Sequence, residues 1–148
     1  MELTVTCSAI DLDAQALARV EEAVFGGEGQ SLEVSVVVVG DAESREVNMA
    51  HLAHDYETDV IAFDLTDDGF PDAPGPDGEI YVNAELAVRE ADERGCDPFS
   101  ELAFYLAHGL LHLLGYDDAS EAERLEMHAL QRRYLEAAGV PPPGPEVA

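Results

Sequence analysis

The sequence predicts a single α+β domain in which a mixed sheet of about four strands packs against about five helices. Three observations favour this fold class. Short runs rich in valine and isoleucine alternate with longer amphipathic stretches. Residues that cap helix N-termini precede several of these stretches, and glycines follow them. The chain has 148 residues, of which 47% are hydrophobic, which suits one core.

The first half of the chain is expected to begin with a strand and a helix. Asp11 or Asp13 can cap this helix, which is expected to run to Phe25 and end at Gly26–Gly27. The unbroken valines within 32–39 favour a strand that is buried on both faces and therefore central. The other elements expected in this half are strands at 2–10 and 59–63 and a helix at 41–53.

Residues 64–78 are rich in proline, glycine and aspartate and form a long loop, which is a candidate flap over a functional site. The strands on either side of this loop can pair as a hairpin. Three helices then follow, each with an N-capping residue, and the domain is expected to end near residue 140. The expected elements are a strand at 79–82, helices at 84–94, 98–114 and 121–138, and a disordered proline-rich tail at 141–148.

The helix that Asp97 and Pro98 open is apolar around nearly its whole circumference, which predicts a buried helix. Two histidines, His108 and His112, lie on it at positions i and i+4. Side chains at this spacing share one face of a helix, so both imidazoles can reach one metal ion, as on the metal helix of zincins. Each histidine alone could instead bond a neighbouring carbonyl, but two that face the same way favour a metal site.

A third ligand can come from the segment after this helix. Gly115 can adopt a positive φ and end the helix, which would let the chain fold back and bring Asp118 to the histidines. His108, His112 and Asp118 are therefore the predicted ligands of one Zn²⁺ ion, with water in the fourth position. Asp118 also precedes a helix start at Ser120, where a carboxylate can serve as a cap instead.

The charge of the chain is strongly negative. There are 32 acidic and 7 basic residues, a net charge of −25, and all the basic residues are arginine. Such a surface is typical of salt-adapted proteins, although an acidic chain that binds a cationic partner is also consistent. General nucleic-acid binding is disfavoured, and Arg132–Arg133 is too small a patch to indicate an RNA footprint.

The sequence also predicts where the protein works. No apolar run is long enough to span a membrane, and the acidic N-terminus has no basic segment of a secretory signal. Cys7 and Cys96 have no CxxC spacing and are expected to be reduced thiols. The expected location is therefore the cytoplasm.

The histidine segment resembles the signature of the YbeY family, His-Gly-x-x-His-x-x-Gly-Tyr-Asp-His, and the resemblance spans about residues 33–135. The segments that carry it are His108–Asp117, Asn48 with Asp55 and Thr58–Phe63, Gly78–Val82, and Glu101–Leu102. It implies a zinc-dependent, single-strand-specific endoribonuclease that acts in rRNA maturation and ribosome quality control. The implied partners are rRNA precursors and the ribosome or its proteins, with no membrane.

Two positions depart from the family pattern. Asp118 stands where the third histidine is usual, which lowers the formal charge of a zinc site from +2 to +1 and predicts a less acidified zinc-bound water. Leu52 stands where the family usually has an arginine, and leucine cannot bind phosphate. His54 or an arginine from elsewhere in the chain could take over that role. The catalytic residues therefore remain unassigned.

Two other functions stay open. The absence of an arginine at position 52 favours a ribosome-associated factor that a metal stabilises but that does not catalyse. A zinc hydrolase that acts on another substrate, such as a peptide, is the second alternative. Proteases of the His-Glu-x-x-His type carry their general base next to the first histidine, and that position is Gly109 here.

Overall fold

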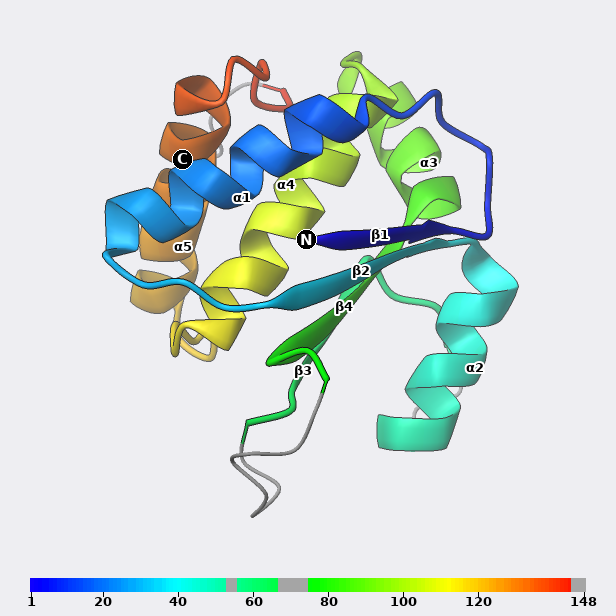
Figure 1. The fold of residues 1–148 in the computed structure, drawn as a ribbon. Coiled ribbons are helices and arrows are strands. Elements are labelled where there is room, and N and C mark those ends of the chain that lie inside the picture. Colours follow the sequence, from blue (N-terminus) through cyan, green and yellow to red (C-terminus); the bar gives the residue numbers. More distant parts are fainter. Residues whose placement is uncertain (53–55, 67–74, 145–148) are drawn as a thin grey trace.

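The computed structural model describes residues 1–52, 56–66 and 75–144. Within them one four-stranded mixed sheet and five helices form the α+β domain that the sequence predicts (Figure 1). The strands are β1 (Glu2–Val5), β2 (Val34–Val39), β3 (Val60–Asp64) and β4 (Gly78–Asn83). The helices are α1 (Ala14–Glu28), α2 (Asp41–Leu52), α3 (Ala84–Arg94), α4 (Pro98–Leu113) and α5 (Glu121–Ala137).

The strand order is β1-β2-β4-β3, so the valine-rich β2 is central, as predicted. It pairs in parallel with β1 and β4, while β3 and β4 form the predicted antiparallel hairpin with Val60 opposite Val82. The prediction of a first strand over 2–10 was too long, because β1 ends at Val5. Thr6 makes one more bond to the Val38 carbonyl, after which the chain leaves the sheet to reach the start of α1.

Capping side chains begin the helices where the sequence places them. Asp13, rather than Asp11, accepts the backbone N–H of Ala16 at the start of α1, and Asn83, Asp97 and Ser120 cap α3, α4 and α5. The predicted end of α1 at Gly26–Gly27 was wrong: the helix continues to Glu28, and Gly29 adopts the left-handed cap conformation. Gly27 serves packing instead, since a Cβ there would collide with the ring of Tyr134.

Helix α4 is the buried centre of the domain, as its all-round apolar surface predicts. It packs on β3 and β4, with α1, α3 and α5 around it, while α2 contacts β4 and α3. The contact with the sheet is close at Gly109, where a Cβ would lie 2.9 Å from Ile80 Cγ2 and 3.1 Å from Val60 Cγ2. The helix ends at Leu113, and Gly115 has a φ of 103°, which lets the chain turn back.

The chain after α5 packs on the body of the domain as far as it is described. Val140 and Pro143 are buried, and the Pro143 carbonyl accepts a hydrogen bond from Arg132. Disorder of the proline-rich tail stays a prediction for residues 145–148, which lie outside the described residues, as does the centre of the predicted flap, 67–74. None of the helices in the described part combines the length and the apolar character needed to cross a membrane.

Candidate metal centre

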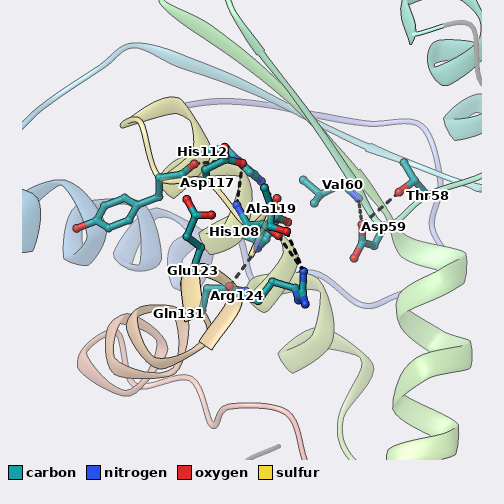
Figure 2. A network of polar contacts seen from close by, with 12 residues as sticks. Thr58, Asp59, Val60, His108, His112, Asp117, Ala119, Glu123, Arg124 and Gln131 are labelled. Atoms are coloured by element: carbon teal, nitrogen blue, oxygen red, sulfur yellow. Dashed lines mark hydrogen bonds and ion pairs between the residues drawn. The ribbon is translucent and has the colours of Figure 1, made fainter. Parts of the chain in front are cut away.

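Three side chains from the end of α4 and the following turn converge on one point (Figure 2). The rings of His108 and His112 meet edge to face, with centroids 4.6 Å apart. Asp118 Oδ2 lies 3.3 Å from His108 Nε2 and 3.7 Å from His112 Nε2. The sequence predicted this meeting of residues, and the positive φ of Gly115 lets the third side chain reach the first two.

The other nitrogen of each histidine is held by an oxygen atom. Nδ1 of His108 lies 3.1 Å from Gln131 Oε1, and Nδ1 of His112 lies 2.9 Å from the Tyr116 carbonyl oxygen. Gln131 is itself buried and donates its amide N–H to the Phe104 carbonyl, which turns its oxygen toward His108. Because both oxygens only accept, Nδ1 is the donor of each hydrogen bond, so in the neutral imidazoles each Nε2 keeps its lone pair for an ion between the rings and Asp118.

The Asp118 carboxylate is not used to start α5. Ser120 caps that helix and forms a capping box with Glu123, while Asp117 accepts the backbone N–H of Asp118. Arg124 reaches back to the carbonyls of Asp118 and Ala119, at 3.3 and 3.4 Å, and so holds the turn (Figure 2). The capping alternative for Asp118 therefore does not hold in this structure.

The donor set suits a transition-metal ion. Two imidazole Nε2 atoms with fixed tautomers and one carboxylate oxygen all lie within 4.8 Å of one another. These are the ligand types that zinc prefers, and three protein ligands leave a position for water or substrate. The Nδ1 partners are of the kind that orient metal-binding histidines in proteins. The three residues could thus hold one metal ion without rearrangement of the backbone.

A cavity of about 300 Å³ opens on the His108 side of this centre. Its wall includes Asp59, which the sequence placed at the start of a strand in a segment that carries the family resemblance. It also includes Arg94 and Arg132, for which the sequence carried no site signal. These side chains arrive from the start of β3, the end of α3 and α5, so only the tertiary fold brings them together. His128 is exposed and also lines this cavity.

A buried acid lies behind the cavity and holds one of its arginines. Glu101 is fully buried, and its Oε1 accepts a hydrogen bond from Arg94 Nη1 at 2.8 Å. Burial raises the pKa of Glu101, and the neighbouring Arg94 opposes that rise. The pair therefore fixes the Arg94 guanidinium at the rim of the cavity.

The His112 side of the centre borders a second groove, of about 410 Å³, whose lining mixes apolar side chains with polar ones such as Asn48 and Thr58. Leu52, at the end of α2, is 47% exposed and lines this groove with Tyr56 and Leu113. No arginine lines it among the described residues. His54, the other candidate substitute, lies outside the described residues.

Comparisons with known proteins agree with the resemblance of the histidine segment. A sequence model described as Endoribonuclease YbeY matches residues 5–139. Proteins named Endoribonuclease YbeY from Salinibacter ruber and Moorella thermoacetica are 38% and 40% identical to the chain. The alignments cover 86% of this chain and 84% of the Salinibacter protein, and 84% of this chain and 85% of the Moorella protein.

The fold is also known from experiment in a similar protein. The solution structure of TM1509 from Thermotoga maritima superposes with a TM-score of 0.60 and 27% identity. The match covers 92% of this chain and 88% of that one. With the family match over most of its length, the chain belongs to the YbeY endoribonuclease family.

Proposed function

We propose that this protein is a zinc-dependent endoribonuclease that cleaves single-stranded RNA in the cytoplasm, during maturation of rRNA precursors and quality control of ribosomes. The observation that carries the proposal is the convergence of His108, His112 and Asp118, with both histidine tautomers set for metal binding. Family membership supports RNA as the substrate, since the relatives are named endoribonucleases.

His108, His112 and Asp118 would hold the zinc ion. Bound there, zinc would supply Lewis acidity toward a phosphodiester and toward the attacking water. The chain's own contribution is to keep the ligands in place: Gln131 fixes the ring of His108, and the Tyr116 carbonyl fixes that of His112. The cavity beside His108 and Asp118 offers room for a phosphate group close to these ligands.

The alternative of a metal-stabilised ribosome factor without catalysis has one observation in its favour. Leu52 borders the groove beside His112, so this side of the centre lacks the arginine usual at that position. The peptidase alternative is weakened further by the structure. Gly109 is pressed against Ile80 and Val60, so position 109 faces the sheet and has no room for a general base.

The test combines zinc content with RNA cleavage, both in concentrated salt because of the charge of −25. The wild-type chain should bind one zinc ion and cut a single-stranded rRNA fragment. The His112→Ala variant should lose cleavage and most of its zinc while keeping its circular dichroism spectrum. His51→Ala is the matched control, because His51 packs on Phe63 and lines neither cavity beside the centre, so its loss should change neither property.

Other results would select the alternatives. If the zinc-loaded wild type leaves RNA intact and His108→Ala lowers only thermal stability, the protein is a non-catalytic factor. If it cleaves casein and spares RNA, it is a peptidase.

A further inference from the structure

We propose that Arg94 and Arg132 form a phosphate-binding subsite in the cavity beside His108 and Asp118, and that this subsite takes one phosphodiester group of the RNA. The inference rests on the proposed function and names the residues through which this chain would grip its substrate. Both arginines line the same cavity of about 300 Å³ as the two metal-centre residues. A phosphate held there would lie next to the candidate metal ion.

The placement of these arginines stands out against the composition of the chain. It has only seven basic residues against 32 acidic ones, so its general surface repels a polyanion. Two of the seven basic residues nevertheless line this one cavity, and they come from different helices. Arginine presents a planar fork of N–H donors that matches two phosphate oxygens at once. RNA binding by this chain therefore has to use a small site with its own positive side chains, and Arg94 and Arg132 supply them in this cavity.

Of the two arginines, Arg132 has the positive charge that is less neutralised by nearby carboxylates. Its side chain is partly buried, and its Nη1 donates to the Pro143 carbonyl at 3.2 Å, which fixes the guanidinium at the wall of the cavity. Within the described residues, no carboxylate forms an ion pair with Arg132. Its charge is thus opposed only by more distant acids. Partial desolvation at the cavity wall lowers the pKa of the neighbouring His128.

Arg94 contributes orientation more than net charge. Its Nη1 pairs with buried Glu101 at 2.8 Å and its Nη2 with Glu90 at 3.5 Å. The side chain is still 43% exposed, which leaves part of the guanidinium open to the cavity. Gly144 lies along its aliphatic part, where a Cβ would be 3.6 Å from Arg94 Cδ. The segment 141–144 therefore supports both arginines from behind.

The proposed subsite also offers an explanation for Leu52, a position that has no donor for a phosphate. Among the described residues no arginine lines the groove beside His112, and Leu52 offers no donor to a phosphate. The cations lie instead on the His108 side, where Arg132 of α5 reaches the cavity. Within the described residues, the arginines that line the two cavities beside the metal centre thus lie on the His108 side only.

The test compares two adjacent arginines of α5. Arg132 lines the cavity, whereas Arg133 is exposed and does not line it, so Arg133→Gln carries the same charge change without touching the subsite. The probes are inorganic phosphate and a short oligouridylate, each titrated into the zinc-loaded full-length chain at one fixed salt concentration. We expect Arg132→Gln to weaken binding of both probes about tenfold and to raise KM for RNA cleavage with little change in kcat. Arg133→Gln should stay within about twofold of wild type.

Arg132→Lys separates charge from geometry. It keeps the charge but loses the fork, so its affinity should fall between those of the wild type and Arg132→Gln. Arg94→Gln is less suitable, because it would leave Glu101 buried without its partner and could unfold the chain. Circular dichroism of each variant checks that the fold is intact.

The outcomes separate the subsite from the proposed function. If the wild type cuts RNA and Arg132→Gln behaves like Arg133→Gln, the subsite is wrong and the function stands. If the contrast between the two variants holds for phosphate and oligouridylate but no RNA is cut, the subsite stands and the function is wrong. If the wild type binds neither probe, the subsite is wrong, and cleavage of the rRNA fragment alone then decides the proposed function.

Discussion

The two histidines of the candidate metal centre are held by different kinds of partner. His112 depends on a backbone carbonyl, which no substitution removes, whereas His108 depends on the side chain of Gln131. Gln131 is 1% exposed, and its amide N–H donates a hydrogen bond to the Phe104 carbonyl. It is therefore the residue outside the ligand set whose loss should affect metal binding most directly.

Gln131→Leu should weaken zinc binding about 10- to 100-fold, because the ring of His108 loses the acceptor that fixes its tautomer. Competition with a chromogenic chelator measures this affinity without any assay of activity. Gln131→Glu keeps the acceptor oxygen toward His108 but replaces the N–H donor to the Phe104 carbonyl by a second oxygen, so its zinc affinity is expected to lie between those of the wild type and Gln131→Leu. Equal zinc affinity of the Leu and Glu variants would contradict a role for Gln131 in holding His108.

Asp118→His should move the pH dependence of RNA cleavage to lower pH. The substitution removes one negative charge from the ligand set and raises its formal charge from +1 to +2, which favours loss of a proton from water at the site. The midpoint of the rising limb of kcat/KM against pH measures the change. Asp117→His, whose side chain only accepts the N–H of Asp118, is the control. A midpoint that stays in place or rises would refute the hypothesis that the negative charge of Asp118 makes water at the site less acidic.

The convergence of the candidate ligands could be predicted from the sequence because they lie within eleven consecutive positions, 108–118, on a helix and one turn. Their supporting residues could not. Gln131 and Arg132 lie on α5 and Arg94 on α3, and their place beside His108 depends on how the helices pack. Periodicity reports which face of a helix is buried, but it does not report which distant side chain meets it.

At the scale of the elements, the sequence predicted helix starts reliably where a capping side chain bonds the backbone of the first turn. The caps Asp13, Asn83, Asp97 and Ser120 bond the first turns of their helices as the sequence predicts. The pair Gly26–Gly27 led to a wrong predicted end for α1, because a glycine can either end a helix or allow close packing. Only the nearby Tyr134 ring shows that close packing applies at Gly27. Likewise the alternating pattern of 2–10 does not reveal that the chain must leave the sheet after Thr6.

Gly109→Ala should destabilise the protein although alanine favours helix. Its Cβ would meet Ile80 and Val60 at 2.9 and 3.1 Å, and the resulting shift of α4 from the sheet should cost about 1–3 kcal/mol. Gly26→Ala is the matched control in α1, where a Cβ meets nothing within 4 Å and a gain of about 0.5–1 kcal/mol is expected. Urea unfolding at fixed salt measures both. The same sign for both variants would contradict close packing as the reason for Gly109.

At the scale of the whole molecule, the dominant feature is a charge of −25 on a domain of 148 residues. Self-repulsion of this size opposes the compact state. Few arginines compensate for it, and some serve specific pairs, such as Arg89 with Asp41 and Arg94 with Glu101. The salt-adaptation and cationic-partner explanations of this surface differ in what they require of the isolated chain.

If the surface is a salt adaptation, the free energy of unfolding should rise with ionic strength. Most of the rise should occur below about 1 M, because the Debye length falls from about 10 Å at 0.1 M to about 3 Å at 1 M. Urea unfolding midpoints across a series of sodium and potassium chloride concentrations measure the effect. The two salts should act alike, because screening depends on ionic strength and not on which cation supplies it. A midpoint that does not change with salt would mean that the fold tolerates its own repulsion, and the acidic surface would then be better explained by a cationic partner.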